Sequence, residues 1–163
     1  MDELLKKLSS YNIFNYLLPG VLFAVLASAL TDLPLVQADI LLGLFLYYFF
    51  GLVISRIGSL IVEPVLRKLG FVTYADYPNY VKACSKDELL PTLSEANNMY
   101  RTICAMILCI GAAVLYNWLT EACPSARQSG PAAILTALFL LFLFSFRKQS
   151  SYITNRVNIV VDE

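Results

Sequence analysis

Four long apolar stretches constrain the fold of this 163-residue chain more than any other feature of its sequence. A transmembrane helix needs roughly 20 mostly apolar residues to cross the hydrocarbon core of a bilayer. Composition agrees, because 58% of the residues are hydrophobic and only 15% are charged, whereas a soluble domain has about 25% charged residues. We therefore expect an all-α integral membrane protein with four transmembrane helices. The predicted spans are residues 13–31, 38–62, 99–120 and 131–147.

Proline interrupts two of the predicted spans. Pro19 lies inside the first span and is expected to kink its helix, because proline lacks an N–H and its ring displaces a carbonyl one turn earlier. Asn12 and Asn15 are close enough in sequence to solvate the freed carbonyl. Pro131 is expected to open the fourth span, which leaves only about 16 apolar residues and requires bilayer thinning, little tilt or shielding by neighbouring helices.

Positive charge predicts the orientation of the spans. Eleven of the twelve Lys and Arg residues fall on one side of the predicted spans: before the first span, in or bordering the segment between the second and third, or at and after the end of the fourth. Under the positive-inside rule, these parts are cytoplasmic in a multi-pass membrane protein, with both termini inside. The predicted division is an N-terminal amphipathic start with the first transmembrane hairpin (1–63), a small helical cytoplasmic segment (64–98), a second hairpin (99–147) and a cytoplasmic tail (148–163).

The segment between the second and third spans contains several helix signals. Gly70 is typical of the position just after a helix, and Asp76 of the position just before one. Thr92 and Glu95 match a capping box, which predicts that a helix begins there and runs unbroken into the third span. For the C-terminal tail two alternatives stay open, since its β-branched run could add as a strand to another sheet or could be disordered.

Aromatic and basic residues gather in the same segment. This composition is typical of residues that anchor protein interfaces, so the segment is a candidate site for a cytoplasmic partner or a signal. The alternative is that these rings cover a small core or lie at the level of the lipid headgroups. The candidate residues are Tyr74, Tyr77, Tyr80, Arg67 and Lys68.

Small residues recur at four-residue spacing in three of the spans. This spacing lets helix backbones approach closely and favours helix packing within the chain or a homo-oligomer interface, although spans are rich in small residues and the pattern also arises by chance. The residues are Gly20, Ala24 and Ser28 in the first span, Gly51, Ser55 and Ser59 in the second, and Ala105, Cys109 and Ala113 in the third.

The sequence predicts no catalytic, cofactor or metal site. It contains no histidine and no C-x-x-C pair among its four cysteines, so it lacks the usual nucleophile pairs and zinc ligands. Its net charge of zero disfavours direct binding of nucleic acid. Arg56 and Glu63 are placed at the membrane interface, where an arginine can extend its guanidinium to the headgroups. No converging ionisable groups are expected within the spans, and the lipid bilayer is the main expected partner.

Three stretches give the chain a resemblance to small four-span inner-membrane proteins of bacterial antiphage defence operons. They are YNIFNYLLPG (11–20), SRIGSLIVEP (55–64) and LSEANNMYRT (93–102). The resemblance implies either a membrane effector that damages the envelope when activated, or a membrane subunit of the Kiwa type that holds a cytoplasmic partner. It transfers no catalytic residue.

The sequence is therefore consistent with two functions. The first is an oligomeric, membrane-perturbing effector regulated through its cytoplasmic segment, which the resemblance favours. The alternative is a non-enzymatic membrane scaffold or sensor that anchors a cytoplasmic protein from the same operon. Polar residues that could line a pore are sparse in the spans, and membrane leakage on activation would distinguish the two functions.

Overall fold

The structure is a computed structural model that describes residues 12–161, without the side chains of residues 124–127 and 160. Within this range the chain forms helices and no strand. Four helical stretches there are long and apolar enough to cross a membrane: Ile13–Leu30, Ile40–Lys68, Leu89–Ala122 and Gln128–Ile159. These findings confirm the predicted all-α, four-span fold. The predicted amphipathic start of the chain lies mostly outside the described residues.

Each of the first two spans is built from an α-helix joined to a short π-helix. The first span comprises η1 and α3, and the second comprises α4, η2 and α5. A short helix, α6, separates them from two long helices, α7 and α8. The bounds are Ile13–Leu17 (η1), Leu18–Leu30 (α3), Ile40–Ile57 (α4), Gly58–Val62 (η2), Glu63–Lys68 (α5), Tyr77–Cys84 (α6), Leu89–Ala122 (α7) and Pro124–Val161 (α8).

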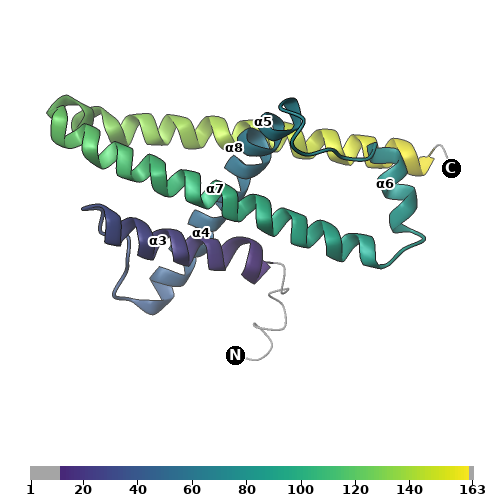
Figure 1. The fold of residues 1–163 in the computed structure, drawn as a ribbon, viewed down its shortest axis with the longest axis horizontal. Helices are drawn as coiled ribbons and strands as arrows, with labels where there is room; N and C mark the ends of the chain where they lie inside the picture. Colours follow the sequence, from purple (N-terminus) through teal and green to yellow (C-terminus); the bar gives the residue numbers. More distant parts are fainter. Residues whose placement is uncertain (1–11, 162–163) are drawn as a thin grey trace.

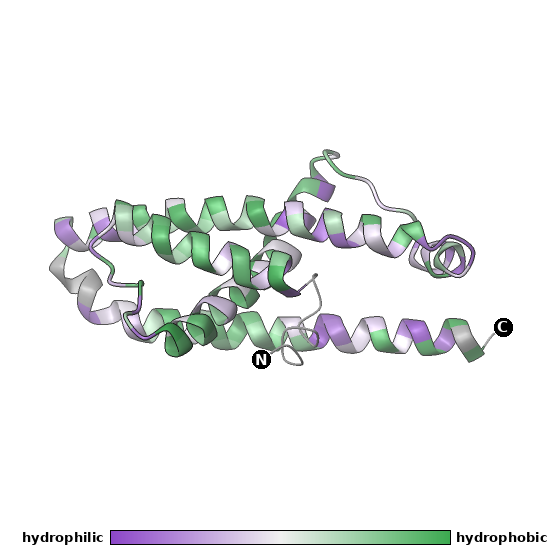
Figure 2. Ribbon diagram, turned by 90° about the horizontal axis from the view of Figure 1, so that it is seen from below, coloured by the Kyte–Doolittle hydropathy of each residue, from purple (hydrophilic) through white to green (hydrophobic). Residues whose placement is uncertain are grey.

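The two longest helices run antiparallel along the molecule and meet at Cys123, while α3 lies beside α7 and the second span crosses the others obliquely (Figure 1). The start of α7, the short α6 and the C-terminal part of α8 lie at one end, which we call the α6 side. Figure 2 shows that α8 changes from mostly hydrophobic to mixed colours toward this side. The α6 side is thus the more polar end of the molecule.

A small apolar cluster joins the second and third spans. It consists of Ile54, Val62, Ala105 and Met106, all of them buried. Elsewhere most large apolar side chains face outward. The most apolar window of the fourth span is only 11% buried, against 28% for the first. Outward-facing apolar side chains suit a protein whose surroundings are lipid, because lipid tails are as apolar as the side chains themselves.

Both π-helices precede a proline at the same spacing. Pro19 and Pro64 each come two residues after the end of a five-residue π-helix. A proline ring collides with the carbonyl four residues earlier, and an extra residue in the turn moves that carbonyl away. The first of these two turns is the irregularity that the sequence predicts near Pro19. In this turn Asn15 is buried among the helices.

Two glycines allow the first two spans to cross in contact. A Cβ atom on Gly20 would collide with the backbone carbonyl of Tyr47, and one on Gly51 with that of Tyr16. Each glycine therefore faces the backbone of the other span. This is the close approach that small-residue spacing predicts, and it occurs within a single chain.

The helix ends of the middle segment match the sequence signals in two places and differ in a third. Gly70 follows α5 with a φ of +70°, as expected for the residue after a helix. Asp76 precedes α6. The predicted start at Thr92 is wrong, because α7 begins at Leu89, whose N–H donates to the Asp87 carboxylate. The helix does continue unbroken into the third span, as predicted.

The fourth span differs most from expectation. Pro131 does not open it, since α8 begins at Pro124 and passes through Pro131 near its start. One internal proline removes a single hydrogen bond from a helix of 38 residues, which the remaining turns tolerate. The strand and disorder alternatives for the tail are wrong, because α8 continues to Val161. An existing helix extends readily, since each added residue gains a backbone hydrogen bond.

Candidate functional site

A buried polar cluster connects the first three spans. Thr102 of α7 places its hydroxyl 2.9 Å from Oδ1 of Asn15 and 3.4 Å from Oγ of Ser55, and Asn15 Nδ2 donates to Ser55 Oγ over 3.5 Å. All three side chains are almost completely buried. Because a polar group in an apolar interior loses free energy unless it is hydrogen-bonded, this cluster fixes how the three spans pack.

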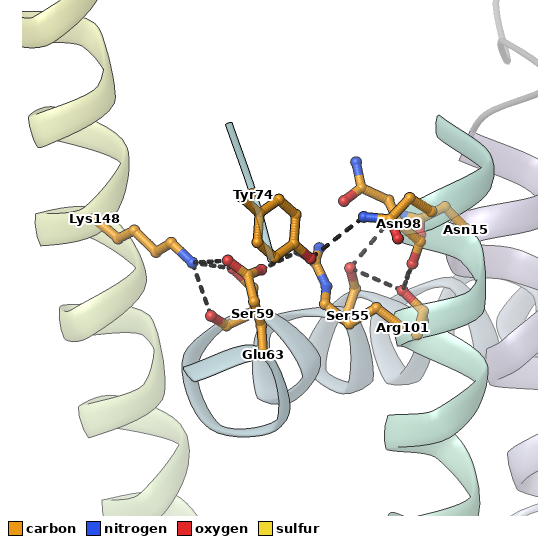
Figure 3. Close-up of polar contacts among 10 residues, drawn as sticks. Asn15, Ser55, Ser59, Glu63, Tyr74, Asn98, Arg101 and Lys148 are labelled. Atoms are coloured by element: carbon orange, nitrogen blue, oxygen red, sulfur yellow. Dashed lines mark hydrogen bonds and ion pairs between the residues drawn. The ribbon is translucent and has the colours of Figure 1, made fainter. Parts of the chain in front are cut away.

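A charged cluster lies beside it, toward the α6 side (Figure 3). The carboxylate of Glu63 bonds to Arg101 of α7 at 2.5 Å and lies 3.8 Å from the ammonium of Lys148 on α8. The Glu63 side chain is only 10% exposed. Glu63 follows the second predicted span, Arg101 lies near the start of the third and Lys148 follows the fourth, so three helical stretches contribute one ionisable group each to a cluster that the sequence did not predict. Glu63 itself is buried between the helices.

Lys148 also binds the backbone of the second span. Its ammonium donates to both the carbonyl oxygen and the hydroxyl of Ser59, each at 2.8 Å. In an α-helix the Glu63 N–H would donate to this carbonyl. Here it donates instead to the carbonyl oxygen of Gly58, five residues back. Pro64, the next residue, has no N–H to offer. The Ser59 carbonyl therefore meets a lysine of the fourth span in place of a backbone donor.

The charged cluster has more donors than it uses. Arg101 and Lys148 face the single carboxylate of Glu63, which leaves one net positive charge. Within residues 12–161, the Nε atom of Arg101 is buried and has no hydrogen-bond partner. A buried N–H without an acceptor is unfavourable. The cluster is consequently suited to receive an additional acceptor or negative charge.

A cavity of about 560 Å³ opens next to this cluster on the α6 side. Its walls come from α5, the following loop, α6, α7 and α8, so it joins the middle segment to the two long helices. Residues of the charged cluster and four of the predicted partner-binding residues share its lining. These residues are Glu63, Arg101, Arg67, Tyr74, Tyr77 and Tyr80.

The tyrosines of the cavity are held by contacts across elements. The Tyr80 hydroxyl lies 2.7 Å from Ser94 Oγ, and the ring of Tyr77 lies 5.7 Å from that of Tyr152 on α8. Asn97 donates to the Tyr74 hydroxyl over 3.3 Å. The Ser94 hydrogen bond favours the ionised phenol of Tyr80, but burial and the nearby Cys84 outweigh it and raise the pKa of Tyr80. Its hydroxyl therefore keeps its proton.

Arg67 and Lys68 separate in the structure. Arg67 lines the cavity with its guanidinium 5.4 Å from the centre of the Tyr74 ring. Lys68 is exposed and is not part of the cavity wall. Arg56, predicted at the interface, is half-buried near the end of α4.

The nine small residues predicted to form packing seams divide into two groups. Six are buried within the single chain, namely Gly20, Ala24, Gly51, Ser55, Ser59 and Ala105. Ser28, Cys109 and Ala113 are half-buried. For the first group the structure supplies a helix-packing role inside one molecule, while the homo-oligomer stays a prediction.

Sequence reasoning missed the convergence of Glu63, Arg101 and Lys148. The signal was present, because an acidic residue ends the second span while basic residues begin the third and end the fourth. Alternating span directions bring these three ends to the same side of a membrane. Taken singly, each charge is read as an interfacial residue or as part of the orientation signal.

The structure also shows which potentially reactive groups the described residues bring together. Among the described residues, no group of three or more His, Cys, Asp or Glu side chains could hold a metal ion. Cys84, Cys104, Cys109 and Cys123 are all free thiols. The site is a set of hydrogen-bond donors and aromatic rings around one carboxylate.

No family model, curated protein or solved structure matches the chain.

Proposed function

We propose that this chain is a non-enzymatic sensor or scaffold of the bacterial inner membrane, which binds a cytoplasmic partner on its α6 side and transmits that binding to its spans. One observation carries the proposal: the α6-side cavity and the charged cluster share Glu63 and Arg101. A partner that occupies the cavity thus contacts the same side chains that join the second and third spans.

The shared residues supply a route from the cavity to the fourth span. Glu63 attracts both Arg101 and Lys148. A group that draws Arg101 away from Glu63 toward the cavity therefore changes the electrostatic interaction between Glu63 and Lys148. Tyr152, which contacts Tyr77 and lies under the Lys148 ammonium, provides a second connection from the cavity to α8. Buried ion pairs respond strongly to such changes, because each partner is poorly solvated.

The orientation in this proposal rests on charge. The α6 side carries Arg67, Lys68, Lys82 and Lys86 in the segment that joins α5 to α7. Short loops rich in lysine and arginine remain in the cytoplasm. The proposed setting, antiphage defence, is supported by the resemblance of the three sequence stretches alone.

A second candidate, an oligomeric membrane-perturbing effector, is favoured by the weak packing of α8. The fourth span has the lowest buried fraction of the four spans. Its polar attachments to the second span run through one residue, Lys148, in the described part of the chain. A signal that detached Lys148 would free α8 to pack against another copy or to disturb the bilayer.

Phage challenge combined with leakage measurements separates the two candidates. Cells that express the chain with and without the soluble protein from a neighbouring gene are infected, and plaques and membrane potential are followed. A sensor protects only with its partner, and its vesicles stay sealed. An effector depolarises cells or leaks vesicle dye without that partner. Failure to protect in every combination would reject the defence setting.

Variants at the cavity test the site itself. Tyr77→Ala with Tyr80→Ala should abolish partner binding while membrane insertion is retained. Tyr100→Ala is the matched control, because Tyr100 is exposed on α7 and does not line the cavity. Equal binding of the partner by the double variant and the control would contradict the proposed site.

A further inference from the structure

A second hollow lies within the span region, between the end of the second span and α8. It is a groove of about 810 Å³ whose walls are mostly apolar. Its apolar lining is Leu60, Ile61, Ala137, Leu140, Leu141 and Phe144. At the end toward the α6 side, α8 contributes four polar residues to the lining: Arg147, Lys148, Ser151 and Tyr152.

The groove, measured along α8 from its apolar end at Ala137 to Lys148 at its polar end, matches the depth of one leaflet. Ala137 precedes Lys148 by 11 residues, or about 16 Å along a helix. Half of a hydrocarbon core about 30 Å thick is about 15 Å. Water is excluded at this depth and apolar walls offer it no hydrogen bonds. An acyl chain fits both the length and the chemistry of this wall.

The polar end of the groove is positively charged. Arg147 is exposed and forms no ion pair within the described residues. An adjoining cavity of about 380 Å³ shares Lys148 and Tyr152 with the groove and adds Arg67 and Glu63. Arg147, Lys148 and Arg67 thus lie around these two adjoining hollows with one carboxylate among them, and that carboxylate already binds a guanidinium of α7. This end complements an anion, with a tyrosine and Ser151 as additional donors.

We propose that the groove binds an anionic glycerophospholipid, with an acyl chain along the apolar wall and the phosphate at Arg147 and Lys148. Positive residues at the end of a span attract anionic headgroups, while the apolar wall selects a molecule that carries a chain. The inference does not rest on the proposed partner, although Tyr152, Glu63 and Arg67 also line the α6-side cavity, because the apolar wall is formed by α8 and the end of the second span.

Lipid retention by the full chain tests this site. The chain is purified in detergent, mixed with phosphatidylglycerol or with zwitterionic phosphatidylcholine of the same chain length, and examined by native mass spectrometry. We expect preferential retention of phosphatidylglycerol, by about fivefold for each basic residue that contacts the headgroup. Inorganic phosphate at the same concentration should not displace it, since phosphate has no acyl chain.

Matched variants separate the two ends of the groove. Arg147→Gln should remove most of the preference for phosphatidylglycerol, whereas Arg156→Gln, which changes an exposed arginine outside the groove, should leave it intact. Ala137→Trp should fill the apolar wall and reduce retention of both lipids. Ala133→Trp is its control, because Ala133 is exposed on α8 one turn away and does not line the groove.

Three results would overturn the proposal. The first is equal retention of the two lipids by the unmodified chain. The second is an Arg147→Gln variant that behaves like Arg156→Gln. The third is an Ala137→Trp variant that keeps its lipid but loses a dimer mass, which would assign the groove to a second copy of the chain.

Discussion

Lys148 supplies the hydrogen-bond donor that the carbonyl of Ser59 does not receive from its own helix. A side chain of the fourth span thus completes the backbone of the second at the point where Pro64 interrupts it. One hydrogen bond therefore both satisfies the carbonyl left free in the second span and attaches the fourth span to it. This relationship leads to the first two of the following predictions.

Lys148→Met should weaken the native packing. The substitution leaves the Ser59 carbonyl without its donor and removes one partner of Glu63, and a buried group left unsatisfied costs about 1–3 kcal/mol. The free energy of unfolding in detergent, measured by SDS titration, should fall by that amount. Arg156→Met on the exposed part of α8 should have little effect. Equal stability of the two variants would contradict the role of Lys148.

Pro64→Ala should reduce the effect of losing Lys148. An alanine at position 64 restores an N–H, and in the π-helical turn this donor reaches the Ser59 carbonyl five residues earlier. In a double-mutant cycle, the penalty of Lys148→Met should therefore be smaller in the Pro64→Ala background, with a coupling of about 0.5–3 kcal/mol. Additive penalties would show that the lysine does not replace the missing donor.

Glu63→Gln should be more harmful than its small change in shape suggests. It leaves Arg101 and Lys148 close together without a compensating charge, and breaking a buried ion pair costs about 3–5 kcal/mol. Combining it with Arg101→Gln removes the uncompensated guanidinium and should recover part of the loss. The melting temperature in detergent provides the measurement. A double variant less stable than Glu63→Gln alone would argue against charge imbalance as the cause.

Gly51→Ala should disrupt the crossing of the first two spans within one molecule. Its Cβ would meet the backbone carbonyl of Tyr16, which cannot move aside like a flexible side chain. Gly111→Ala is the control, because nothing lies within 4 Å of a Cβ there, and it should be neutral or stabilising by up to about 1 kcal/mol. Thermal unfolding of the monomer fraction distinguishes this from an effect confined to oligomers.

Two single-cysteine variants should test the orientation of the chain. Cys84 ends α6, whereas Cys123 lies at the turn between α7 and α8 on the opposite side. If the α6 side is cytoplasmic, a maleimide that does not cross membranes should label intact spheroplasts at Cys123 and label Cys84 only after lysis. The reverse pattern would reject the orientation inferred from the positive charges.

The sequence predicts the spans and the simple helix ends because these depend on local properties. Apolar length identifies the membrane segments, and Gly70 and Asp76 mark helix boundaries through their own backbone preferences. The second span extends past the predicted end at residue 62 to Lys68, and within this extension Glu63 is buried by partners from other helices. No local pattern contains that information.

The candidate site was predictable only in part. Tyr74, Tyr77 and Tyr80 recur at close spacing, so their clustering can be read from the segment itself. Their contact with Tyr152 and the approach of Lys148 to Ser59 depend on how α8 lies against the rest. That placement depends on the continuation of α8 as a helix past residue 147. The sequence pattern left the conformation of this tail open between a strand and disorder.

The π-helix Gly58–Val62 has a consequence for how the second span can change length. A π-helical turn holds one residue more than an α-helical turn. Deleting a single residue there would convert the turn to α geometry and leave the two flanking faces in their present register. The same deletion elsewhere in the span would rotate one half against the other by about 100°. Shortening at this turn would therefore keep the helix faces in register, but it would require Pro64 to be replaced as well, because the proline ring would then meet the carbonyl four residues earlier.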